Sequence, residues 1–112
     1  MRTVPVYRND KVIVEKVVIS NSFLRTARGL MFTKSLDPSA GILLMNCNSV
    51  HTFFMHYAIG VIYLSKDFNI TKIVPKLERR RGSIDRQAKH VLEIHPDRLQ
   101  ELNLKVGDIL RF

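Results

Sequence analysis

The sequence predicts a mainly β domain with an α+β tendency, built as a compact antiparallel sandwich or small β-barrel with one or two short helices. Short segments rich in Val and Ile recur along the chain and are separated by turn-forming residues. The longer helical segments of about 10 to 15 residues that connect parallel strands are missing. The length of 112 residues is enough for one core without disulfides or metals, so we expect a single domain over residues 1–112.

The N-terminal part of the chain indicates two strands followed by a short helix. Residues 3–19 are rich in Val and Ile and are interrupted by the polar residues 8–11, which predicts two strands joined by a turn. Glu15 and Lys16 break the apolar pattern of the second strand, so we expect either a bulge there or a strand that passes from one environment to another. Residues 20–29 begin with serines suited to cap a short helix and end with a glycine suited to terminate it.

The middle of the chain predicts four more short strands. The residues from Asp37 to Gly41 have the composition of a turn. Beyond it, apolar segments predict strands at residues 42–45, 52–55, 59–64 and 70–74. The last two are expected to form a hairpin in which Asn69 is the residue best suited to a positive φ.

The C-terminal part predicts a strand, a short helix, a turn and a final strand. In the strand over residues 88–95, alternation places His90 on the core side and His95 toward solvent. Asp97 is the expected N-cap of the helix, because its carboxylate is suited to accept from free backbone amides. The glycine at position 107 indicates the last turn.

The segment HTFFMH, at residues 51–56, places two of the four histidines around two phenylalanines and a methionine. Residues of a strand share a face only when they are an even number apart. His51 and His56 are five apart, so a regular strand keeps them from binding one ion. Close ligand pairs of the C-x2-C or H-x3-H kind are also missing. We therefore expect a strand buried on both faces, no metal site and no cofactor.

The single cysteine, Cys47, bears on both location and chemistry. It excludes an intrachain disulfide and, with no apolar N-terminal run of signal-peptide length, favours a cytoplasmic protein. A Cys47 thiolate activated by His51 is the catalytic alternative. No third group completes such a site, and a lone cysteine in apolar surroundings is more often a core residue. The sequence therefore favours a protein that is not an enzyme.

Basic residues are concentrated between residues 72 and 89, a segment that includes the polar connection expected at residues 75–87. The seven basic residues there, against two acidic ones, give +5 of the formal +8 of the whole chain. One interpretation is a nucleic-acid-binding loop that uses Lys76, Arg79, Arg80 and Arg81; the other is a loop kept soluble by its charge. Because no recognition motif accompanies the loop, nucleic-acid binding would be indifferent to sequence and sensitive to salt.

The longest apolar stretch, residues 53–64, has 12 residues and includes a histidine. A helix needs roughly 20 apolar residues to cross a bilayer. We therefore expect this stretch in the core and no membrane partner.

Three stretches together resemble the domain of unknown function 192 family, also called uncharacterised protein family 0127. They are RTARGLMFTKSL at 25–36, VHTFFMHYAIGVIYLSKD at 50–67 and AKHVLEIHPDRLQELNLKVGDILRF at 88–112. The motif positions are Arg28, Gly29, Leu30, Met31, His51, Thr52, Phe53, Phe54, Met55, Gly107 and Asp108. The resemblance, over about residues 20–112, implies a compact, mainly β domain with short helices. The family has no established activity to carry over.

This chain departs from the family pattern at two places. Ala58, Ile59 and Gly60 stand where members usually have a Pro, an aliphatic residue and an Asp. The missing Asp weakens the enzyme interpretation and leaves Arg28 to find another partner. Phe68 stands where a Gly is common, which supports the assignment of the positive φ to Asn69.

These features together predict a small cytoplasmic binding or accessory domain. We expect a pocket bordered by Arg28, His51, His56 and Tyr57 that binds an anionic small molecule or the carboxylate of a partner. The reason is that polar groups in apolar sequence blocks are satisfied by one another or by a ligand. The alternative, that they only satisfy one another, remains open.

Overall fold

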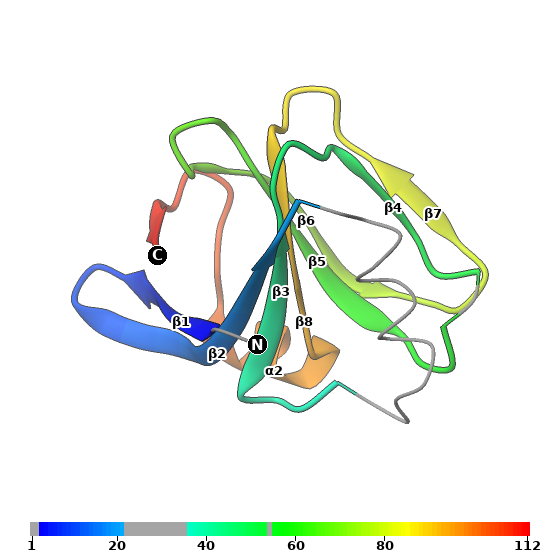
Figure 1. Cartoon of the computed structure of the whole chain (residues 1–112), viewed down its shortest axis with the longest axis horizontal. Helices are drawn as coiled ribbons and strands as arrows, with labels where there is room; N and C mark the ends of the chain where they lie inside the picture. Colours follow the sequence, from blue (N-terminus) through cyan, green and yellow to red (C-terminus); the bar gives the residue numbers. More distant parts are fainter. Residues whose placement is uncertain (1–2, 22–35, 54) are drawn as a thin grey trace.

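The computed structural model describes residues 3–21, 36–53 and 55–112 (Figure 1). Its elements are β1 (Thr3–Arg8), β2 (Lys11–Ser20), β3 (Ala40–Leu44), β4 (Ser49–His51), β5 (Ile59–Leu64), β6 (Ile70–Leu77), β7 (Gly82–Ile84), β8 (His90–Ile94), α2 (Pro96–Leu102) and β9 (Leu110–Arg111). The predicted mainly β class is confirmed. The helix expected at residues 20–29 and the candidate Arg28 lie outside the described residues.

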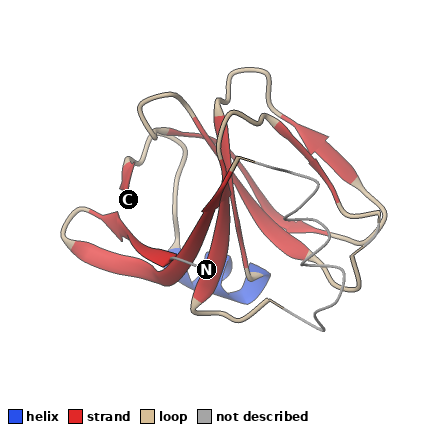
Figure 2. Cartoon of the chain, viewed as in Figure 1, coloured by secondary structure: helices blue, strands red, loops and turns tan. Residues whose placement is uncertain are grey.

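The strands form two sheets. Seven of them make a curled sheet in the order β6-β5-β8-β3-β2-β1-β9, and β4 pairs with β7 in a separate two-stranded sheet (Figure 2). All pairings of the large sheet are antiparallel except that of β2 with β3, which is parallel. The two ends of the large sheet approach each other where Asn69 bridges Ile109. The result is a half-barrel.

The bulge predicted in β2 is confirmed. Val4 pairs with Val17 and Val6 pairs with Val14, so β2 carries one residue more than β1 between these pairs. The amides of Glu15 and Lys16 at the bulge both donate to the carbonyl of Ser39, with N···O distances of 3.2 and 2.9 Å. The turn before β3 therefore compensates for the interrupted ladder.

Both faces of the sheet centre are buried, so the molecule has two cores. One lies under α2 and includes Leu92 and Ile94 of β8. The other includes Val91 of β8 and is covered by Val50 of β4 and by Met55. Strands β5 and β8 are consequently buried along their whole length.

The N-cap predicted for the helix is wrong by two positions. The cap is His95, whose Nδ1 accepts from the amide of Asp97 at 3.0 Å. Pro96 occupies the first turn, where its fixed φ and missing N–H suit a helix start. Arg8 donates to the carbonyl of Leu102 at the other end, at 3.0 Å. Among the described residues, no helix is both long and apolar enough to cross a membrane.

The positive φ in the β5–β6 turn falls on Phe68, not on Asn69, so that prediction is wrong. Phe68 has a φ of 65°. Its ring stacks on His90, with ring centroids 5.0 Å apart, and also contacts Phe112 at 5.2 Å. The Phe68 carbonyl accepts from Leu110, where the half-barrel nearly closes. The aromatic contacts and this closure hold a conformation that Phe adopts poorly by itself.

Candidate functional site

The strands β4 and β7 form a short ribbon that the sequence did not predict. Figure 1 shows them side by side at the right of the view, on the side opposite to the C-terminus. His51 pairs with Gly82, and Ser49 pairs with Ile84. Val50 points into the core between β4 and the large sheet, whereas Ile84 is exposed. Residues 82–84 thus belong to a strand and not to a long connection, and β6 extends to Leu77.

The strand expected through the segment HTFFMH is not found at its described residues, which corrects the central expectation for it. Strand β4 ends at His51, and Thr52, Phe53, Met55 and His56 lie in a turn and irregular backbone. Thr52 is fully buried and Met55 is buried, but Phe53 is 56% exposed. The alternation of side chains along a strand therefore does not determine whether His51 and His56 point to the same side.

Thr52 fastens this loop to the arginine turn, which we define as residues 78–81. Its amide donates to the carbonyl of Arg81 at 2.9 Å, and its hydroxyl accepts from the amide of Arg81 at 3.0 Å. The Thr52 carbonyl accepts from the amide of Arg80 at 3.2 Å, and the Thr52 hydroxyl donates to the carbonyl of Glu78. Arg80 takes a positive φ of 61°. One buried threonine therefore fixes the backbone of the whole turn.

The arginines of this turn differ in their contacts. Arg79 donates from Nε to the carbonyl of Met55 at 3.3 Å. Arg80 and Arg81 are exposed, and neither forms an ion pair with a carboxylate of the described chain. Their positive charges are thus presented to solvent from a fixed backbone.

The two acidic residues of the basic segment are already engaged. Glu78 forms an exposed ion pair with Lys76 at 3.5 Å. Asp85 accepts from the hydroxyl of Thr71 at 2.6 Å and from the amide of Gln87 at 3.1 Å. Neither carboxylate is directed to Arg80 or Arg81 by these contacts. The excess charge of the segment is not cancelled locally.

One residue of the predicted pocket, His51, lies beside the arginine turn. His51 pairs with Gly82, which directly follows the arginine turn, and its ring contacts Phe53 at 5.5 Å. His56 is exposed and Tyr57 is half-buried against the core under β4. Arg28, the fourth predicted pocket residue, lies outside the described residues. The predicted pocket is therefore placed only in part.

Cys47 and the histidines form no visible reactive cluster in the described part of the chain. The Cys47 thiol is half-buried and donates to the carbonyl of Ser49 at 3.0 Å. His90 is buried as predicted and accepts from the amide of Asn46 at 3.1 Å. Burial, and to a lesser degree Lys89, lowers the pKa of His90. No group of three His, Cys, Asp or Glu residues within the described ranges is placed to hold a metal.

Glu93 is a functional candidate that sequence reasoning missed. Alternation puts it on the side of β8 that carries His95, which we expected to face solvent. Instead Glu93 is 1% exposed, and neither carboxylate oxygen has a hydrogen-bond partner among the described residues. Burial raises the pKa of Glu93 to about 7. The available signal was a glutamate between two aliphatic residues, Leu92 and Ile94, inside the predicted strand.

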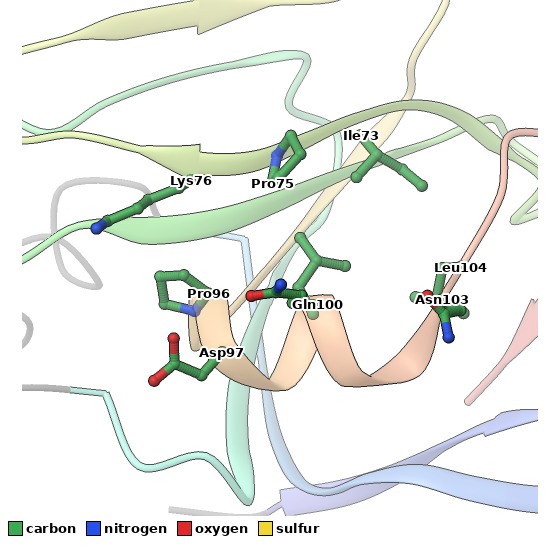
Figure 3. A pocket seen from close by; sticks show the side chains of 9 residues that line it. Ile73, Pro75, Lys76, Pro96, Asp97, Gln100, Asn103 and Leu104 are labelled. Carbon is green, nitrogen blue, oxygen red and sulfur yellow. The ribbon is translucent and has the colours of Figure 1, made fainter.

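A groove of about 550 Å³ lies elsewhere, between β6 and α2 (Figure 3). Ile73 and Pro75 of β6 face Pro96 and Gln100 of the helix across it. Lys76 lies at its rim and is the one predicted site residue that lines it. The groove is therefore distinct from the ribbon and its turn.

The comparisons with known proteins concern family and fold. The chain matches the family model DUF192, described as "Uncharacterized ACR", over residues 5–112. A protein of unknown function from Novosphingobium aromaticivorans DSM 12444 has a similar structure, with a TM-score of 0.75 and 21% identity; the match covers 98% of this chain and 85% of that one. A "putative transcription regulator" from Sinorhizobium meliloti 1021 matches with a TM-score of 0.71 and 16% identity, over 86% and 78% of the two chains. Among curated proteins, none matches. At these identities the structural likenesses show the fold alone.

Proposed function

This chain belongs to the DUF192 family of uncharacterised proteins. We propose that it is a small, non-catalytic domain that binds an anionic group at the arginine turn. The group is a phosphate, sulfate or carboxylate carried by a small molecule or by a partner. The observation that carries the proposal is the exposure of Arg80 and Arg81, without a carboxylate partner in the described chain, on a backbone fixed by Thr52.

The chemistry of arginine favours this ligand class. A guanidinium presents a planar set of donors that matches an oxyanion, often through two parallel hydrogen bonds. Because the backbone of the turn is already fixed, less conformational entropy is lost when an anion binds. The formal net charge of +8 also raises the local concentration of anions. We propose that His51, His56 and Tyr57 border this site, since they lie close in sequence to Thr52 and Met55, which are hydrogen-bonded to the turn.

A second candidate is sequence-indifferent binding of nucleic acid. It is favoured by the basic residues that continue on both sides of the turn, such as Lys72, Lys76 and Arg86, all of which are exposed. A phosphodiester backbone is a repeated oxyanion and would contact several of these residues at once. We also propose a cytoplasmic location, which the free thiol of Cys47 supports.

A pair of charge-reversed variants tests the proposal. Arg80→Glu/Arg81→Glu changes the turn, and Lys66→Glu/Lys105→Glu makes the same change of charge at exposed lysines far from it in sequence. The probes are sucrose octasulfate, whose charge is constant across the working pH range, and a single-stranded oligonucleotide, each titrated at two salt concentrations. We expect octasulfate affinity to fall at least about tenfold in the arginine variant and much less in the lysine variant.

The outcomes separate the candidates. The parent could bind the oligonucleotide but not octasulfate, and the arginine variant could lose the oligonucleotide. This combination would favour the nucleic-acid candidate. Equal affinities of the arginine variant and the parent for both probes would overturn both candidates.

A further inference from the structure

The carboxylate of Glu93 lies in the middle of an apolar sheet face. In the two ladders of β8, Glu93 pairs with Ile42 of β3 and with Val61 of β5. Cross-strand partners share a face, so these aliphatic side chains flank the carboxylate on both sides. Within the described chain, neither oxygen has a donor, and burial is the cause of the raised pKa of Glu93.

Among the described residues, the charged groups around this face do not compensate a negative charge on Glu93. Strand β3 contributes only aliphatic residues to it. Strand β5 contributes Tyr63, which is fully buried and whose pKa is raised, mainly by burial, so that it stays neutral. Asp85 after β7, the Cys47 thiol and Glu93 itself also raise the pKa of Tyr63, whereas Lys72 of β6 lies over the Tyr63 ring at 5.7 Å. An ionised Glu93 would therefore need water to reach it.

The cover of this face is also the support of the arginine turn. Val50 and Met55 belong to the same core as Ile42 and Val61. The Met55 carbonyl accepts from Arg79, and the Met55 amide donates to the carbonyl of Thr52 at 3.2 Å. Since Met55 belongs to the core that contains the cross-strand neighbours of Glu93, an opening of this core that moves Met55 would disturb the hydrogen bonds that hold the turn.

We propose that Glu93 is a proton-operated latch for the arginine turn. With the proton bound, the apolar face stays closed and the loop of Thr52 and Met55 fixes the turn. When the carboxylate ionises, the cover loosens and the turn loses its fixed backbone. This inference rests on the proposed function and names the regulation of that site.

The first test uses the protein without any anion. Exchange of the backbone amides of Thr52 and Arg81, corrected for the intrinsic effect of pH, is measured at pH 6 and pH 8. Since the pKa of Glu93 shifts from 4.5 to about 7 on burial, opening becomes about tenfold more favourable between these pH values. We expect this loss of protection in the parent and in Glu15→Gln, which changes an exposed glutamate. Glu93→Gln should not show it.

A second variant keeps the exchange test interpretable if Glu93→Gln does not fold. Glu93→Met also removes the ionisable carboxyl group at this position. It is used in place of Glu93→Gln if the buried side-chain amide of glutamine prevents folding. An equal loss of protection in the Glu93 variants would attribute the response to groups other than Glu93 and would overturn the latch. An unchanged protection factor in the parent would overturn it as well.

Titration with sucrose octasulfate at the same two pH values separates the two proposals. A parent that binds octasulfate equally at both values would overturn the latch and leave the proposed function standing. The protein could instead show amide exchange that depends on Glu93 but fail to bind octasulfate. That result would leave the latch standing and overturn the proposed function. Binding that is weaker at pH 8 in the parent but not in Glu93→Gln supports both.

Discussion

Thr52 and Arg81 are bound to each other by three hydrogen bonds, of which the longest, at 3.3 Å, runs from the Thr52 hydroxyl to the Arg81 carbonyl. The Thr52 amide donates to the Arg81 carbonyl, and the Arg81 amide donates to the Thr52 hydroxyl. This pair joins the backbone that follows β4 to a turn 29 residues later in the sequence. It makes one basic site out of two segments that are distant in sequence.

Thr52→Val should destabilise the protein and weaken anion binding. The change keeps the shape of the side chain but leaves the Arg81 amide and the Glu78 carbonyl without the hydroxyl. A buried polar group without its partner costs about 1 to 3 kcal/mol, so we expect a loss of that size in the free energy of unfolding. Urea unfolding measures it. Thr52→Ser retains the hydroxyl and should lose clearly less; equal losses in both variants would show that the hydroxyl is not what matters.

The free energy of unfolding should decrease as the pH rises from 5 to 8. The pKa of Glu93 is raised in the folded state, from 4.5 to about 7, so the folded protein holds this proton more tightly than the unfolded one. The resulting stabilisation is present in full below the unfolded pKa and is lost as the pH rises through the folded pKa. By linkage the loss is about 2 to 3 kcal/mol over this range.

Urea unfolding of Glu93→Gln at several pH values checks the assignment. His90 acts in the opposite direction, because burial lowers its pKa and its protonation destabilises the folded state at low pH. Without Glu93, the stability should therefore rise between pH 5 and pH 7 and then level off. A variant that still loses stability above pH 7, as the parent does, would contradict the role of Glu93.

Substitution of Phe68 should reverse the usual order of Ala and Gly. Phe68→Ala removes the ring that packs on His90 and Phe112, which costs about 3 kcal/mol, and it keeps a side chain at a φ of 65°. Phe68→Gly loses the same ring but relieves the backbone strain, so it should be more stable than Phe68→Ala by about 1 kcal/mol. Thermal unfolding compares the two. A glycine variant less stable than the alanine variant would mean that the positive φ is not strained here.

The elements that were predictable are those fixed by local pattern. Strand β5, Ile59–Leu64, has the predicted bounds, and it belongs to a continuous apolar run that ends at the polar Ser65. The bulge at Glu15 and Lys16 was visible because two charged residues interrupt an apolar strand. In both cases the information lies within about ten residues of the element.

The elements that were missed depend on distant partners. Thr52 and Met55 look like strand residues because they are apolar or β-branched, but their backbone bonds go to the arginine turn. Alternation puts Glu93 beside Val91, yet it does not tell that a second layer covers that face. The positive φ went to Phe68 because its ring is held by His90 and Phe112, far along the chain. Tertiary contacts decided each of these against the local preference.

The most direct test of the arginine turn as an anion site is a nitrogen-15 NMR titration of the protein with sucrose octasulfate at pH 6. We predict that the largest shifts fall on the side-chain Nε–H groups of Arg80 and Arg81 and on the amides around Thr52 and Gly82. Shifts that are largest at Lys66, Lys105 or the groove beside Gln100, with the arginine turn unchanged, would contradict the account.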